Sequence, residues 1–240
     1  MSVITLEELI KAGFHFGHRT ARWNPKMKPY IFSKHNLIHI IDLRGTLRGL
    51  ITANKFLARL SAAGKDVLFV GTKWQARDTV AREARRANMH FVTERWLGGT
   101  LTNFNTIRLR LKHLKELEEL LASEDIKQYS KKMVSSLNRE AKKLKKNLDG
   151  IRNMMELPGA VIIVDPNREL TAVREANKLG IPTICLTDTD CDPDLVDICV
   201  PGNDDAMRSI EVFLSKMTDA ILDSKSSSKP VVSLQEVGQP

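Results

Sequence analysis

Short apolar runs alternate along this chain with segments in which apolar residues recur every three or four positions. The apolar runs predict buried strands near residues 66–71, 90–93, 160–165, 183–187 and 197–200. The intervening segments predict helices near residues 47–58, 75–88, 170–179 and 206–222. Strands that are apolar throughout and separated by helices are typical of a parallel sheet covered on both faces. We therefore expect an α/β fold of the doubly wound, Rossmann- or flavodoxin-like type, with a mainly parallel five-stranded sheet and right-handed crossovers.

One interval between predicted strands, residues 104–151, is too long for a single crossover helix. Leucine and isoleucine recur there at helical spacing in two series, at 107, 111, 114 and 121 and then at 137, 144, 148 and 151. An acidic and polar turn near residues 123–125 separates the two series. This pattern predicts an inserted antiparallel coiled-coil hairpin. Its lysine-rich faces fit either solvent exposure or contact with RNA.

The two ends of the chain carry weaker signals. Thr5-Leu-Glu-Glu8 has the form of a capping box and predicts a short helix that ends near Gly13. The predicted organisation is an α/β sandwich domain made of residues 1–103 and 152–224, with an N-terminal basic and aromatic extension at 9–41. The coiled-coil hairpin occupies residues 104–151, and a flexible tail rich in Ser and Lys occupies residues 225–240.

Residues 9–41 contain no acidic side chain. Cations of such a segment neutralise phosphates, and aromatic rings stack on unpaired bases. Because Pro25 and Pro29 fix their own φ angles, we expect residues 22–30 to form an ordered, extended loop. A basic segment that only keeps the protein soluble is the simple alternative, but the interleaved rings favour RNA. These rings are Phe14, Phe16, Trp23, Tyr30 and Phe32.

Charge is distributed unevenly along the chain, whose formal net charge is +8. Residues 1–155 carry 30 Lys and Arg against 14 Asp and Glu, a net charge of +16. Residues 156–240 carry 7 against 15, a net charge of −8. A field of one sign over part of a molecule attracts a polyanion, which favours RNA as a partner of the N-terminal part. The acidic part fits a basic protein neighbour.

A second polar and aromatic stretch covers residues 95–108. Gly98 and Gly99 let the backbone approach a partner closely, and Thr102 and Asn103 are short hydrogen-bonding side chains. In the alternative, Thr102 or Asn103 caps the first long helix and Trp96 packs in the core. The predicted RNA-binding residues are Arg19, Arg22, Trp23, Lys26, Lys28, Lys34, Lys73, Arg95, Thr102, Asn103, Arg108 and Arg110.

The carboxyl ends of the predicted strands are where an enzyme with this fold would bind its ligand. The segment Gly71-Thr72-Lys73 has one glycine, so it is neither a Walker loop nor a dinucleotide-binding motif. Aspartates at 165, 188 and 204 fit a magnesium or phosphoryl-transfer site, but aspartates at strand ends are also ordinary helix caps. A nucleotide-dependent enzyme therefore stays as the alternative function, and no catalytic residue is assigned.

A structural metal ion is a separate hypothesis. His18 with Asp188, Asp204 or Asp205 would give a mixed nitrogen and oxygen site if the N-terminal loop folds over the sheet edge. Such ligands suit zinc or magnesium. The three cysteines lack the close paired spacing of a zinc knuckle. No cofactor is therefore required, and a structural zinc or magnesium ion remains a prediction.

Seven segments spread in order along the chain carry a resemblance to a known family. They are KAGFHFGH (11–18), RWNPKMKPYI (22–31), FVGTK (69–73), RWLGGTLTN (95–103), LP (157–158), EANKLGIP (175–182) and PGNDDA (201–206). Together they resemble the bacterial and organellar family of ribosomal small-subunit protein two. The likeness covers nearly the whole chain apart from the tail.

The resemblance implies an α/β sandwich with a protruding coiled-coil hairpin and no catalytic activity. It implies binding to small-subunit (16S-type) rRNA and contact with neighbouring small-subunit proteins, including the large messenger-binding ribosomal protein one, which it helps to recruit. Apolar runs are too short to cross a bilayer, so no membrane partner is expected. The expected location is the ribosome in a bacterial cytoplasm, or in an organelle stroma or matrix.

Overall fold

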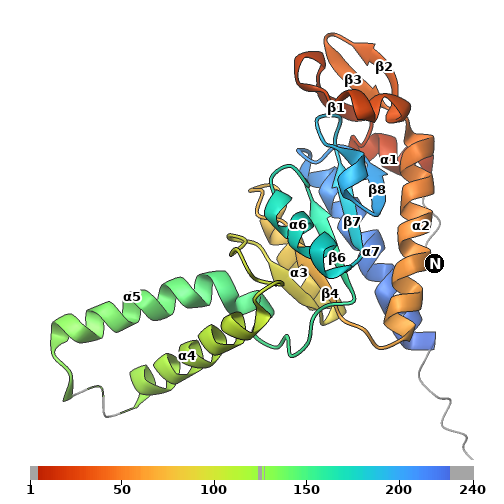
Figure 1. Ribbon diagram of the computed structural model, residues 1–240. Coiled ribbons are helices and arrows are strands. Elements are labelled where there is room, and N and C mark those ends of the chain that lie inside the picture. The colour runs from red at the N-terminus through yellow and green to blue at the C-terminus, as the bar shows by residue number, and fades with distance from the viewer. Residues whose placement is uncertain (1–4, 124–125, 127, 228–240) are drawn as a thin grey trace, which may run out of the picture.

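A five-stranded parallel sheet forms the centre of the protein in the computed structural model, which describes residues 5–123, 126 and 128–227 (Figure 1). Its strands are β4 (Val67–Val70), β5 (His90–Val92), β6 (Ala160–Val164), β7 (Thr183–Thr187) and β8 (Ile198–Pro201). They lie in the order β5-β4-β6-β7-β8, and every neighbouring pair is parallel. The expected doubly wound α/β fold is confirmed.

Helices cover both faces of this sheet, which explains why its central strands are apolar at every position. Along β4, Val67 and Phe69 pack into one core, while Leu68 and Val70 pack into the other. The first core lies against α2 (Leu43–Ala62), α3 (Arg77–Ala87) and α7 (Met207–Ser227). The second lies against α6 (Leu170–Leu179) and the segments next to the inserted helices.

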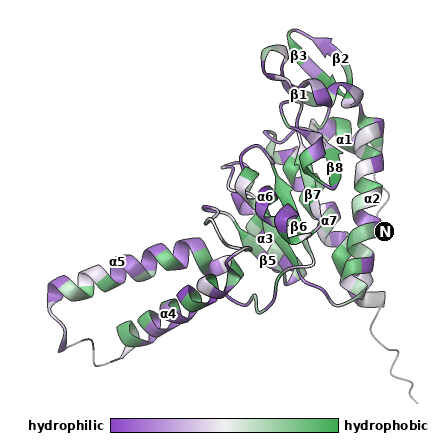
Figure 2. Ribbon diagram, in the orientation of Figure 1, coloured by the Kyte–Doolittle hydropathy of each residue, from purple (hydrophilic) through white to green (hydrophobic). Residues whose placement is uncertain are grey.

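Two helices occupy the long interval between β5 and β6. They are α4 (Phe104–Ala122) and α5 (Lys131–Leu148), and they lie side by side and project away from the sheet (Figure 1). Ile107, Leu114 and Leu117 of α4 and Ala141 and Leu148 of α5 are buried. The remaining faces are largely hydrophilic, most clearly along α5 (Figure 2). The two helices contact each other and each buries part of its apolar face, while their assignment as a coiled coil stays a prediction.

The N-terminal segment forms a small module of its own at the β8 edge of the sheet. Helix α1 (Leu6–Ala12) begins after Thr5, whose side chain accepts a hydrogen bond from Glu8 N, and ends at Gly13 in the left-handed conformation, as predicted. An antiparallel sheet follows, in the order β1-β3-β2. Its strands are β1 (Phe16–Arg19), β2 (Ile31–His35) and β3 (Ile38–Ile41).

The prediction of an extended loop over residues 22–30 is wrong. The chain forms short 3-10 helices at Thr20–Arg22 and Pro25–Tyr30. Pro25 stands at the start of the second helix, where a fixed φ and a missing N–H are both tolerated. The Asn24 side chain accepts a hydrogen bond from Lys26 N and so caps this helix.

The C-terminal helix is longer than its apolar pattern predicts. Helix α7 continues to Ser227, so residues 225–227 of the predicted flexible tail are helical. The rest of that predicted tail, residues 228–240, lies outside the described residues. Within the described part of the chain, no helix combines the length and apolar character that a membrane crossing demands.

Candidate functional site

The N-terminal module is attached to the carboxyl end of β7 through backbone contacts. His18 N donates hydrogen bonds to Asp188 Oδ1 at 3.1 Å and to Thr189 Oγ1 at 3.0 Å. Asn24 N donates to Thr189 O at 2.8 Å. A Cβ atom at Gly17 would lie only 2.7 Å from Thr189 Cγ2. Glycine at this position therefore lets strand β1 lie directly against the sheet edge.

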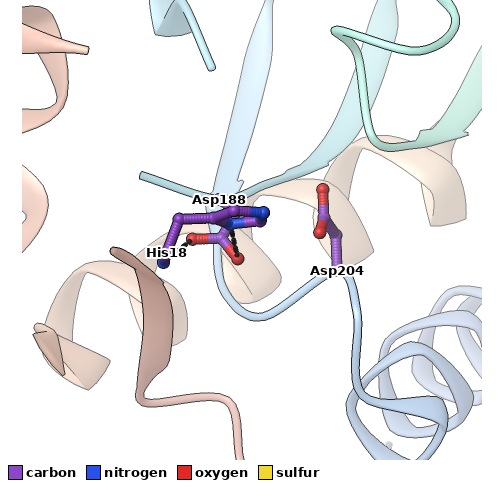
Figure 3. Close-up of side chains that lie close together, drawn as sticks. All are labelled: His18, Asp188 and Asp204. Atoms are coloured by element: carbon purple, nitrogen blue, oxygen red, sulfur yellow. Dashed lines mark hydrogen bonds and ion pairs between the residues drawn. The ribbon is translucent and has the colours of Figure 1, made fainter. Parts of the chain in front are cut away.

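The His18 ring joins this attachment as a cation. Its Nδ1 lies 2.8 Å from Asp188 Oδ2, and its Nε2 lies 3.5 Å from Asp205 Oδ2 (Figure 3 shows the pair with Asp188). The hydrogen bond and the charge of Asp188 outweigh burial and raise the pKa of His18 to about 9. The ring is therefore protonated at neutral pH, and its charge balances that of the buried Asp188.

Asp204 completes the predicted metal-ligand group. One ligand atom from each of His18, Asp188 and Asp204 lies within 4.8 Å of the other two (Figure 3). Asp204 is almost wholly buried, and burial together with the charges of Asp165 and Asp188 raises its pKa. A crowded group of acids beside an imidazole fits a cation, since a positive charge relieves the repulsion between carboxylates. Asp205 lies on the rim of this group.

Lys73 already supplies one cation at this edge of the sheet. Its Nζ atom lies 2.7 Å from Asp204 Oδ1, 2.7 Å from Asp205 Oδ1 and 3.4 Å from Asp165 Oδ2. Burial disfavours the charged form, but the charge of Asp204 and the hydrogen bonds to Asp204 and Asp205 outweigh it and raise the pKa of Lys73. The residue is only 8% exposed. This placement corrects the assignment of Lys73 to an RNA-contacting surface.

A cleft of about 430 Å³ separates the N-terminal module from the carboxyl end of the sheet. Its lining includes the acidic Asp188 and Asp205 together with the basic Arg19 and Arg22. The predicted strand-end aspartates and the predicted basic segment therefore meet at one place. Sequence spacing alone did not show that they would.

The basic residues of the N-terminal module divide into two kinds. Arg19, Arg22, Lys28 and Lys34 are exposed and form no ion pair with any acid in the described ranges. Lys26 instead forms ion pairs of 2.8 Å with both Asp192 and Asp194. Its charge is neutralised within the molecule, which makes it a structural link between the module and the loop after β7. Trp23 is half-buried, with its ring 5.3 Å from that of His39.

The loop over residues 95–103 is organised by Glu175, an acid to which the sequence pattern assigns no role. Glu175 of α6 is buried, and it accepts hydrogen bonds from Trp96 Nε1 at 3.1 Å, Gly99 N at 2.8 Å and Leu101 N at 3.0 Å. Thr102 donates to the same carboxylate through both its N–H and its hydroxyl, each at 3.2 Å. In the sequence, Glu175 stands next to Ala176 on the apolar face of the helix predicted at residues 170–179. An acid at such a position is the signal that could have identified it as buried.

The two predicted RNA-contacting stretches lie at opposite edges of the sheet. The N-terminal module lies at the end of β7 and β8, whereas residues 95–110 follow β5 at the other edge. Thr102 and Asn103 are exposed although Thr102 is held by Glu175, and Asn103 begins helix α4 without a side-chain cap. Structural and RNA-contacting roles are therefore compatible there. Further exposed cations on this side are Arg95, Arg108 and Arg110.

Comparison with known proteins gives a consistent result along the chain. Residues 9–224 match the family described as ribosomal protein S2. The small ribosomal subunit protein uS2 of Rhodopirellula baltica is 56% identical, over 92% of this chain and 85% of the relative. The proteins of the same name from Syntrophobacter fumaroxidans and a Roseiflexus species are 52% and 51% identical, over 94% and 92% of this chain and 82% and 84% of the relatives.

Proposed function

The chain belongs to the ribosomal protein S2 family, and from this premise we propose that it binds small-subunit rRNA through its basic N-terminal half. It is a structural constituent of the small ribosomal subunit of bacterial type and not an enzyme. The nucleotide-dependent enzyme considered from the sequence is therefore set aside. The strand-end aspartates then need another role, which their contacts with His18 and Lys73 supply.

The observation that carries the rRNA proposal is the set of exposed, unpaired cations in the acid-free segment 9–41 of the N-terminal module. Arg19, Arg22, Lys28 and Lys34 are exposed and form no ion pair with the acids of the described residues, whereas Lys26 is neutralised by Asp192 and Asp194. Cations that have no internal partner are free to neutralise phosphates and release the counterions bound to RNA. The exposed residues of the loop at 95–110 offer a second contact at the other edge of the sheet.

We also propose that the chain helps to recruit the large messenger-binding ribosomal protein one. The support is the charge of the C-terminal part, where residues 156–240 carry 7 Lys and Arg against 15 Asp and Glu. Those acids of this part that stay exposed, such as Glu156 and Asp197, repel rRNA and attract basic groups of a protein neighbour. The basic and acidic parts would thus face different partners within the same subunit.

Binding to small subunits that lack this chain tests both proposals. The double variant Arg22→Ala, Lys28→Ala should bind more weakly at every salt concentration. The slope of log K against log salt should become shallower by roughly 1.4 to 1.8 if each residue contacts one phosphate. Sedimentation through gradients of increasing salt measures both quantities. The amount of messenger-binding protein retained on the same subunits gives the second readout, which should rise when the wild-type chain is restored.

Lys26→Ala is the matched control, because Asp192 and Asp194 already neutralise that charge. Its salt slope should equal that of the wild-type chain. Equal slopes for the double variant and the wild type would refute rRNA binding through this module. Sedimentation of the wild-type chain apart from small subunits at moderate salt would refute the ribosomal role as a whole. Unchanged retention of the messenger-binding protein would refute recruitment alone.

We further propose that His18, Asp188 and Asp204, with Asp205 at the rim, hold a zinc or magnesium ion. Nitrogen and carboxylate ligands of this kind bind zinc, and carboxylates alone suit magnesium. Lys73 contacts Asp204 through Oδ1, which leaves the other carboxylate oxygen for an ion. An ion there would fix the N-terminal module to the sheet and supply no chemistry beyond that link.

Zinc affinity should depend on pH, because an ion bound through His18 must displace its proton. The pKa of His18 is raised from 6.5 to about 9. The affinity for zinc should therefore rise about tenfold per pH unit between pH 6.5 and about 9. Competition with a chromophoric chelator measures it. Asp188→Asn should abolish binding, whereas Asp190→Asn, which changes an acid outside the ligand group, should preserve it. Equal affinities of these two variants, or no saturable binding of either metal by the wild type, would reject the site.

A further inference from the structure

The hairpin formed by β2 and β3 lies at the outer end of the N-terminal module (Figure 1). Two of its large apolar side chains are exposed. Phe32 and Leu37 are each 74% exposed. By contrast, Phe14 of the same acid-free segment is fully buried in the main core. The hairpin therefore places two large apolar groups in solvent, whereas Phe14 of the same segment is packed in the core.

The geometry of the hairpin holds these side chains in place. Strands β2 and β3 pair in antiparallel register, and the pair His35↔Ile38 closes a turn of two residues. Those residues, Asn36 and Leu37, have φ angles of 45° and 62°. This turn type suits Asn at its first position but usually has Gly at its second. A leucine in this strained conformation, with its side chain in solvent, has no packing explanation among the described residues.

The surroundings of Phe32 are cationic. Phe32 and Lys34 are two residues apart in β2 and both are exposed, and Phe32 lies where the pairing register with β3 shifts, between Ile31 and Ser33. Lys28 is exposed just before the strand. No acidic residue occurs between Leu9 and Ile41. An exposed ring with a lysine two residues away is the arrangement that binds a base and the phosphate next to it.

We propose that Phe32 stacks on an unpaired base of small-subunit rRNA, with Lys34 on a neighbouring phosphate and Leu37 against the adjacent nucleotide. The inference rests on the proposed function, and it adds the kind of RNA bound. Bases in a duplex are stacked on each other and inaccessible to a side ring, so the partner is a loop, bulge or end. The hairpin thus binds unpaired bases of rRNA, while Arg22 and Lys28 provide contacts with phosphates that depend only on charge.

The salt dependence of binding distinguishes stacking contacts from phosphate contacts, because only phosphate contacts release counterions. With small subunits that lack this chain, Phe32→Ala should weaken binding about 5- to 150-fold, which corresponds to roughly 1–3 kcal/mol for loss of one stacked base. The salt slope should stay that of the wild type, because no phosphate contact is removed. Phe32→Tyr, which keeps a ring, should restore binding. Ultraviolet irradiation of the wild-type complex should crosslink the peptide containing Phe32 to rRNA.

Trp74→Ala is the matched control, since Trp74 is also 74% exposed but lies outside the acid-free segment. It should bind as the wild type does. The inference is overturned if Phe32→Ala binds within twofold of the wild type, if its salt slope changes, or if Trp74→Ala weakens binding equally. A crosslink from the Phe32 peptide to a ribosomal protein in place of rRNA also overturns it. Failure of the wild-type chain to bind subunits would instead refute the proposed function.

Discussion

Replacing Glu175 by alanine should lower the free energy of unfolding by about 4 kcal/mol. The carboxylate accepts hydrogen bonds from Trp96, Gly99, Leu101 and Thr102, and its removal leaves these donors without an acceptor. Each buried donor left unsatisfied costs roughly 1–3 kcal/mol, and partial rearrangement keeps the total below the sum. A surface carboxylate of the same chain would be expected to contribute only a few tenths of a kcal/mol.

The pH dependence of this contribution has a definite sign. Burial raises the pKa of Glu175, but the hydrogen bonds from Gly99, Trp96, Thr102 and Leu101 outweigh burial and lower it below 4.5. A carboxyl group whose pKa is lowered by folding stabilises the folded state above its unfolded pKa. This stability is lost as the pH falls through the folded pKa. The difference between wild type and Glu175→Ala should therefore shrink under acidic conditions.

Chemical denaturation of the two proteins at neutral and acidic pH measures the effect. Hydrogen exchange should show that the Gly99 and Leu101 amides lose protection in the variant before β4 and β6 do. Glu156→Ala, at an exposed position, is the control and should change stability by less than about 0.5 kcal/mol. A loss below 1 kcal/mol for Glu175→Ala would mean that water replaces the carboxylate without cost.

The sheet was predictable because its strands are apolar at every position. All residues of β6 and β7 are buried, as the continuous apolar runs in the sequence predict. The small N-terminal sheet was not predictable in the same way. In β2 only Ile31 is partly buried, and the other residues are exposed and polar or aromatic. Strand β2 therefore lacks the alternation of apolar and polar residues by which a half-buried strand is predicted.

The candidate site shows a similar division. His18, Asp188 and Asp204 were proposed together from their chemistry, and the fold brings them within ligand distance of one another. Lys73 and Glu175 were judged wrongly or missed because a charged residue is ordinarily exposed. The sequence does not reveal that Lys73 and Glu175 are buried with their hydrogen-bonding partners, because those partners lie about 75 to 130 positions away along the chain.

Lys73 also explains why acids gather at the carboxyl edge without forming a catalytic centre. In a phosphoryl-transfer site a metal ion would neutralise such aspartates. Here the ammonium of Lys73 lies between Asp165, Asp204 and Asp205 and balances part of their charge. Lys73, which follows the strand-end glycine in Gly71-Thr72-Lys73, is therefore a structural cation in the folded protein.

Lys73→Met should accordingly destabilise the fold by about 3–5 kcal/mol at neutral pH, because it leaves buried carboxylates without their cation. The pKa of Asp204, already raised above 3.8 by burial and its neighbours, should rise further in the variant. A carboxyl group with a raised folded pKa costs nothing below its unfolded pKa, and its cost grows as the pH increases above 3.8. Stability of the variant relative to wild type should thus recover on acidification.

Denaturation of Lys73→Met at acidic and mildly alkaline pH tests this account, with Lys65→Met at an exposed position as the control. Adding Asp204→Asn to Lys73→Met should restore about half or more of the lost stability, since a neutral amide needs no cation. If the loss were the same at both pH values and Asp204→Asn gave no recovery, Lys73 would act through packing of its alkyl chain. Recovery through Asp204 would instead establish that charge balance at this edge holds the ends of β4 and β8 together.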